Sequence, residues 1–188
     1  MAIKKASEIP TIDVNLVTIQ EEGDNTDEYI LDTASQIQVE PQVEEEDGVK
    51  LVVKGVLKAQ KLGTRTLTGN QITLTDNVFT PELVQLMQGG KLTRGEDNVV
   101  TGYTPPVAGS NEKGKIFTLK AYSAQYNAAG VIVRYECISY PNCQGVPIAF
   151  NSTDGEFRTP EYVINSAPDI GEAPYTITYV NTLPTVAS

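Results

Sequence analysis

The sequence predicts a mainly β fold, a β-sandwich or barrel-like domain with long hairpins and one short flanking α-helix at about residues 80–89. Three observations predict it. Apolar and polar residues alternate in several short runs, turn-forming residues separate these runs, and one segment alone carries both start and stop signals of a helix. The length of 188 residues suits a single domain, 1–188, with residues 1–10 as a candidate N-terminal arm.

The first half of the chain contains four predicted strand regions, at residues 12–16, 37–39, 49–59 and 72–74. The third region is ambiguous, because its lysines also fit helical spacing. Its valines and Gly55 favour a strand that has Val49, Leu51, Val53 and Leu57 on one face and Lys50, Lys54 and Lys58 on the other.

The predicted helix spans residues 80–88. Thr80 is placed to cap its N-terminus, Pro81 suits the first helical position, and Glu82 favours the positive end of the helix dipole. A hydrophobic staple between Phe79 and Val84 fits the same start. The apolar face of the helix consists of Leu83, Leu86 and Met87, and we expect it to be buried. The helix ends at two consecutive glycines, Gly89 and Gly90.

The second half predicts a surface loop at 101–114, because that segment is rich in Gly, Pro, Ser and Asn. Strands at 116–126 and 131–140 are joined by a turn at 127–130 and form one hairpin. Segments 145–151 and 156–164 flank Asp154-Gly155, a strong turn signal, and predict a second hairpin. A last strand covers 175–180, and Pro184 follows it.

The charges are segregated along a chain whose formal net charge is -10. Residues 6–49 contain thirteen acidic residues and no Lys or Arg, and a basic run follows at once. We expect this run to make subunit contacts through complementary charge; a solvated loop beside a lysine-bearing strand explains the pattern equally well. The candidate contact residues are Lys50, Lys54, Lys58, Lys61 and Arg65. No residue is assigned to a lumen.

Catalytic and metal-binding chemistry finds little support. The chain has no histidine, so histidine-based triads and most zinc sites are excluded. Cys137 and Cys143 flank a turn; we interpret them as reduced thiols, although a local disulfide is geometrically possible. The remaining candidates are single carboxylates, at Asp76, Glu136 and Glu156, and a conceivable calcium loop, better explained as a solvated loop, at Glu21, Glu22, Asp24, Asn25 and Asp27. No cofactor is expected.

The nine tyrosines raise the alternative of a binding surface for sugar or protein. Seven of them fall on predicted strands, where a half-buried tyrosine is ordinary sheet packing. These are Tyr122, Tyr126, Tyr135, Tyr140, Tyr162, Tyr175 and Tyr179. We expect no membrane-spanning helix, since no apolar run approaches about 20 residues. No secretion signal is visible, so folding in a cytoplasm is expected.

Two stretches resemble tail tube proteins of phages and prophages of Gram-positive bacteria. The first is GNQITLTDNVFTPELVQLMQGG, at residues 69–90, and the second begins FTLKAYSAQYNAAG at residue 117 and runs to residue 180. Together they cover somewhat more than half of the chain. The resemblance implies a β-sandwich with a flanking helix, six copies in a ring, and rings stacked into a hollow tube.

The resemblance also implies partners and a location. The partners would be other copies of the chain, the tape-measure protein and, as further candidates, sheath, baseplate and terminator proteins. DNA would pass without specific binding, and an acidic wall suits that role because like charges remove adhesive phosphate contacts. The product would be a virion tail assembled in the host bacterial cytoplasm. The alternatives are a β-sandwich module that binds carbohydrate or a host surface, and an enzyme that uses carboxylates alone.

Overall fold

The computed structural model describes residues 8–23 and 28–185, which form a mainly β fold with one short helix. The predicted fold class is therefore confirmed. The elements of this part are, in chain order, β1 (Thr11–Glu21), β2 (Glu28–Leu31), β3 (Ala34–Glu46), β4 (Val49–Val53), β5 (Val56–Lys61), β6 (Thr64–Asp76), α1 (Pro81–Gln88), β7 (Lys91–Arg94), β8 (Val100–Thr104), β9 (Ile116–Tyr126), β10 (Ile132–Gly145), β11 (Glu161–Ser166) and β12 (Thr176–Val180).

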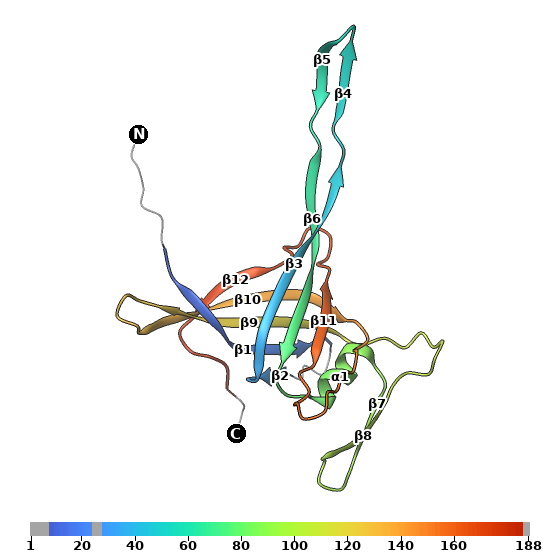
Figure 1. Cartoon of the computed structure of the whole chain (residues 1–188), viewed down its shortest axis with the longest axis vertical. Coiled ribbons are helices and arrows are strands. Elements are labelled where there is room, and N and C mark those ends of the chain that lie inside the picture. The colour runs from blue at the N-terminus through green and yellow to red at the C-terminus, as the bar shows by residue number, and fades with distance from the viewer. Residues whose placement is uncertain (1–7, 24–27, 186–188) are drawn as a thin grey trace.

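One eight-stranded antiparallel sheet builds the body, in the order β2-β1-β9-β10-β11-β6-β3, with β12 paired to β10. Figure 1 shows β1, β9 and β10 running across the direction of β3, β6 and β11, so the sheet folds over itself like a sandwich. Strand β10 belongs to both halves of the sheet, because it pairs with β9 in one half and with β11 in the other. Its register shifts between Tyr140 and Cys143, where Asn142 has a φ of 48°. A bulge of this kind bends a strand, which lets the last residues of β10 pair with β11.

The core lies between the two halves of the sheet. Alternate residues of the crossing strands point into it, and those of β6 and β11 are fully buried. Its largest fully buried apolar side chains are Tyr162, Phe117, Ile19, Ile72, Leu74, Leu83, Met87, Leu119, Ile164, Val17 and Val84. A smaller cluster of Leu16, Tyr122 and Cys137 covers the other face of β1, β9 and β10.

Helix α1 docks on one end of this core, as the apolar face of the predicted helix requires. Its buried residues include the three predicted ones, Leu83, Leu86 and Met87, and Gly89 ends it with a φ of 81°. Thr80 occupies the N-cap position, but its side chain makes no capping hydrogen bond. The backbone supplies the cap, because the Thr80 carbonyl accepts hydrogen bonds from Leu83 and Val84 at 3.1 and 3.3 Å.

The segment predicted as one strand at 49–59 is a hairpin. Lys54 and Gly55 have φ values of 52° and 79°, so both lie in the left-handed region that a two-residue hairpin turn of type I′ requires. Strands β4 and β5 pair on either side of this turn. The prediction failed because a lysine gives no sign that it will adopt a positive φ.

Two further predictions differ from the structure. Residues 101–104 belong to β8, which pairs with β7, so the predicted loop begins after Thr104. Residues 146–160 contain no strand, although Asp154 and Gly155 do form a turn. The hairpin predicted around that turn fails because β10 ends at Gly145 and β11 begins only at Glu161. The hairpin of β9 and β10 was predicted correctly. Most of the candidate N-terminal arm lies outside the described residues.

Candidate assembly surfaces

The most prominent surface is a long β-hairpin that leaves the body. We call residues 44–67 the arm and residues 49–62, which include β4 and β5, the arm tip. The outermost pair between β6 and its body neighbour β11 is Asn70 with Ser166, so β6 and β3 continue alone beyond it (Figure 1). At about 3.3 Å per residue, the chain from residue 69 to the turn at Gly55 extends about 45 Å.

The arm tip exposes apolar side chains. Seven large hydrophobic residues are between 44% and 71% exposed: Val49, Leu51, Val52, Val53, Val56, Leu57 and Leu62. The sequence predicted one apolar face and one lysine-bearing face here. The structure buries neither, because the arm extends past every strand or helix that could cover it. Apolar surface of this extent, interspersed with lysines, is typical of a protein-interaction surface.

The predicted basic run divides into two groups. Lys61 pairs with Glu46 at 2.5 Å and Arg65 pairs with Glu45 at 2.8 Å, so two of the five candidates contact the acidic segment of the same chain. Lys50, Lys54 and Lys58 make no ion pair in the described part of the chain. These three lysines, all on the arm tip, are the ones free to contact another molecule.

A narrow point separates the arm tip from the rest of the arm. Gly48 and Gly63 lie opposite each other there, between the pairing of β3 with β6 and that of β4 with β5. A Cβ on Gly48 would lie 2.8 Å from the Gly63 nitrogen, and one on Gly63 would lie 2.6 Å from the Glu46 oxygen. Only glycine lets the two backbones approach this closely.

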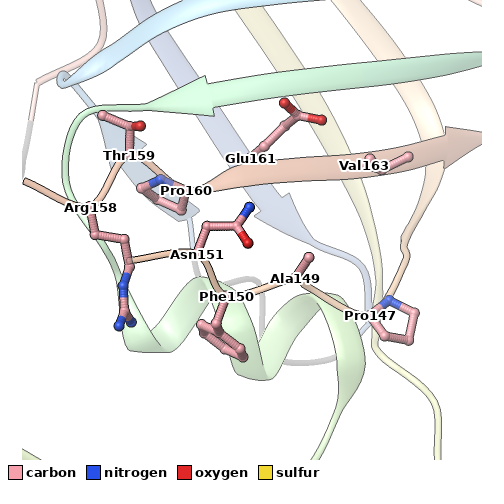
Figure 2. Close-up of a pocket in the computed structure, with 9 residues that line it drawn as sticks. All are labelled: Pro147, Ala149, Phe150, Asn151, Arg158, Thr159, Pro160, Glu161 and Val163. Atoms are coloured by element: carbon pink, nitrogen blue, oxygen red, sulfur yellow. The ribbon is translucent and has the colours of Figure 1, made fainter. Parts of the chain in front are cut away.

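A second surface lies at the far end of β6. We call residues 146–160 the pocket loop; it ends where Glu161 pairs with Thr75, close to the start of α1. Figure 2 shows it beside the helix, around a cavity of about 230 Å³. The lining residues are Pro147, Ala149, Phe150, Asn151, Arg158, Thr159, Pro160, Glu161 and Val163.

Aromatic rings and one arginine shape this pocket. The Phe79 and Phe150 rings meet edge to face at 5.9 Å, and the Arg158 guanidinium lies 5.7 Å from each ring. Arg158 also donates a hydrogen bond to Ser152 at 2.8 Å. Phe150 is 51% exposed and Phe157 is 97% exposed. Phe79 therefore contacts the pocket loop, in addition to any staple contact with the helix.

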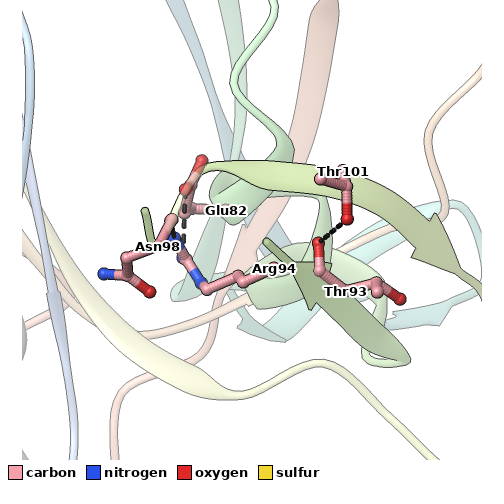
Figure 3. A network of polar contacts seen from close by, with 5 residues as sticks. All are labelled: Glu82, Thr93, Arg94, Asn98 and Thr101. Atoms are coloured by element: carbon pink, nitrogen blue, oxygen red, sulfur yellow. Dashed lines mark hydrogen bonds and ion pairs between the residues drawn. The ribbon is translucent and has the colours of Figure 1, made fainter. Parts of the chain in front are cut away.

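The hairpin of β7 and β8 stands beside this surface and is tied to α1. Arg94 pairs with Glu82 of the helix at 3.1 Å and donates a hydrogen bond to the Asn98 carbonyl at 2.8 Å. The Thr101 hydroxyl donates to the Thr93 carbonyl at 3.1 Å across the two strands (Figure 3). These contacts hold the acidic turn with Glu96 and Asp97 at the helix end of the molecule.

Open strand edges form a third kind of surface. Strands β2 and β3 terminate the order of the main sheet, and β12 pairs with β10 alone. Ile177 and Tyr179 of β12 are 47% and 50% exposed. Open edges present unpaired backbone donors and acceptors to another chain, and Pro41 on β3 reduces that capacity because it has no N–H.

The predicted catalytic carboxylates have separate surroundings. Asp76 is fully buried at the end of β6, where the Thr33 hydroxyl donates to it at 2.6 Å. Glu136 on β10 accepts a hydrogen bond from Gln125 at 3.3 Å, and Glu156 lies exposed on the pocket loop. Nothing pairs these three groups in one cleft.

The predicted calcium loop falls mostly outside the described residues, which exclude 24–27. Its two described members bind within the chain: Glu21 pairs with Lys115, and Glu22 accepts a hydrogen bond from Thr118 at 3.1 Å. In residues 8–23 and 28–185, no group of three or more acidic or cysteine side chains is arranged to hold a metal ion.

The cysteines and tyrosines mostly serve packing. Cys137 and Cys143 are both buried free thiols, and burial raises the pKa of Cys143 to about 12. Burial likewise raises the pKa values of Tyr122, Tyr140 and Tyr162 to about 12. Of the more exposed rings, Tyr179 is covered by the Arg134 guanidinium at 3.8 Å, and Tyr175 lies 6.2 Å from Tyr140.

Comparisons with known proteins add one structural likeness. No protein-family model matches the sequence, and no curated protein matches it. Among solved structures, the chain is similar to one in the cryo-EM structure of the baseplate of the anti-feeding prophage, solved with six-fold symmetry. The identity is 11% and the TM-score 0.37, over 96% of this chain and 98% of that chain. No helix in the described residues is long and apolar enough to cross a membrane.

Proposed function

We propose that this chain is a structural subunit of a phage-type tail, a tail tube protein that assembles with copies of itself into stacked rings. The single observation that carries the proposal is the arm tip, with its seven exposed large hydrophobic side chains. A monomer gains nothing from holding these residues in water. Burying them against another subunit removes that apolar surface from water, at about 25 cal/mol per Å².

Two other features support assembly. The open edges of β2, β3 and β12 offer backbone groups through which neighbouring copies can continue a sheet around a ring. The resemblance of residues 69–90 and 117–180 to tail tube proteins supplies the class of assembly. In that assembly, the tape-measure protein and DNA occupy the shared channel. The net charge of -10 suits a wall along which DNA passes without sticking.

The basic run has a specific place in this proposal. We infer that Lys50, Lys54 and Lys58, which lack ion-pair partners in the described chain, contact a neighbouring copy. Lys61 and Arg65 act differently, because their pairing with Glu46 and Glu45 holds the two strands of the arm together. All five residues thus contribute to assembly, three of them directly and two through the shape of the arm.

Negative-stain electron microscopy and analytical ultracentrifugation of the purified chain test the proposal. We expect rings or tubes of uniform diameter that form above a threshold concentration. Tail particles from a producing cell should contain the chain in many copies. A chain that stays monomeric at all concentrations and is absent from tails would show that the proposed function is wrong.

A further inference from the structure

The two ends of the molecule carry opposite charges. The arm tip contains four lysines and no acidic residue. Residues 146–161, which are the pocket loop and Glu161, contain three acidic residues and one basic residue. Strand β6 runs from the arm to Asp76, next to Thr75, which pairs with Glu161. The basic surface and the acidic surface therefore lie at opposite ends of the molecule, along the direction of β6.

Both ends also expose apolar side chains in shapes that complement each other. The arm tip is a narrow hairpin whose exposed residues are aliphatic. The pocket loop offers a cavity of about 230 Å³ beside Phe150, with the 97% exposed ring of Phe157 next to it. Long loops without secondary structure in a compact domain are usually functional, and large aromatic residues dominate the binding energy of many interfaces.

Charge repulsion makes contact between the arm tips of two copies unfavourable. Two arm tips would bring six unpaired lysines together, because Lys50, Lys54 and Lys58 of each tip lack a partner in the described chain whereas Lys61 pairs with Glu46. Contact between a tip and a pocket loop instead joins a net positive surface to a net negative one. Arg158 does not reverse this sign, because three acidic residues surround it in sequence and its guanidinium lies beside the two phenylalanine rings.

We propose that the arm tip of one copy binds the pocket loop of the next copy, head to tail along the direction of the arm. In this contact, Leu57 or a neighbouring aliphatic residue enters the cavity beside Phe150, and Lys54 and Lys58 face Asp154 and Glu156. Each copy then has one free tip and one free loop, so the contact repeats without closing and builds a stack with a defined polarity. The inference rests on the proposed function, since it names the surface that receives the arm in that assembly.

Cysteine cross-linking tests the contact directly. Leu57→Cys and Phe157→Cys in one chain should give a ladder of disulfide-linked multimers under mild oxidation, because every contact joins a tip to a loop. Either substitution alone should give no more than the background of random dimers. The native cysteines are both buried and so contribute little. Dimers from Leu57→Cys alone, formed as fast as the ladder, would show tip-to-tip contact and overturn the proposal.

Charge exchange gives an independent measurement on the same surfaces. Lys54→Glu/Lys58→Glu and Asp154→Lys/Glu156→Lys should each raise the concentration needed for stacking about tenfold, as expected for two exposed ion pairs. Combining all four substitutions should restore it to within about threefold. The matched control, Glu96→Lys/Asp97→Lys, makes the same charge change on the neighbouring β7–β8 turn and should not restore the arm variant. Restoration by the control would assign the receiving surface to that turn.

The outcomes separate this inference from the proposed function. Normal tubes without a ladder would refute the contact and leave the tail tube proposal standing. A wild-type chain that remains monomeric, with no ladder, would refute both. Rings that form but do not stack in the arm variant would support both, because ring closure uses the strand edges and stacking uses the arm.

Discussion

The apolar arm tip yields the sharpest quantitative prediction. Val52 and Leu57 are cross-strand partners, 55% and 50% exposed in the isolated chain. Fully burying such a side chain stabilises by about 1.5–3 kcal/mol, and about half of that remains available when the side chain is half exposed. Replacing both by threonine, which keeps strand propensity, should weaken each arm contact by about 2 kcal/mol, or roughly 30-fold.

Sedimentation measures the effect as the total protein concentration at which half of the chain pellets as assemblies. Urea unfolding of the monomer should change little, because the arm tip does not contact the core. Val107→Thr/Val133→Thr is a matched control, since those residues are 79% and 56% exposed and lie outside the arm, on the loop after β8 and on β10. If the arm variant pelleted at the wild-type concentration, or if its monomer lost as much stability as its assembly, the arm would not be an apolar docking element.

Three further predictions concern the fold. Gly145→Ala would place a Cβ 2.5 Å from the Met87 sulfur and 2.6 Å from its Cα, so it should lower the free energy of unfolding, measured in urea, by about 1–3 kcal/mol. Gly102→Ala is the control, because its Cβ would lie 3.9 Å from its nearest neighbour, and it should cost less than about 1 kcal/mol. Leu74→Ala removes a fully buried side chain and should cost about 2–5 kcal/mol by the same measurement, and a cost below about 1 kcal/mol would contradict the assigned core. Cys143 should resist alkylation in the native state at pH 8, and rapid native alkylation would show that this thiol is accessible. The free energy of unfolding should also depend on pH through this thiol. It should be unchanged below about pH 9 and decrease from there towards pH 12, because the unfolded thiol ionises while burial holds the pKa of the folded thiol near 12.

Local chemistry in the sequence predicted several elements well. Helix α1 was predictable because Pro81, an apolar face and two glycines act within ten residues of chain, 81–90. The hairpin of β9 and β10 was predictable because alternating residues flank a short turn at 127–130. The local sequence does not show which segments will pair with one another as strands, so β2, β7 and β8 were not predicted.

The candidate site was predicted only in part. The basic run was identified from charge alone, and the structure shows that Lys61 and Arg65 are paired inside the arm. The pocket loop was missed, because the turn at Asp154 and Gly155 suggested a hairpin. Two phenylalanines, Phe150 and Phe157, within a segment rich in Asn, Ser, Thr and Gly were the available signal of an exposed aromatic surface.

The sequence by itself determined the strand-rich class, the single helix and the segregation of charge, because propensity, capping and charge are properties of neighbouring residues. The tertiary structure alone decided which apolar residues are buried. Leu57 and Leu74 both lie in segments of alternating pattern, yet Leu74 is fully buried and Leu57 is half exposed. The difference arises because β11 and the opposite half of the sheet cover one part of β6, whereas no described residue outside the arm covers the arm tip.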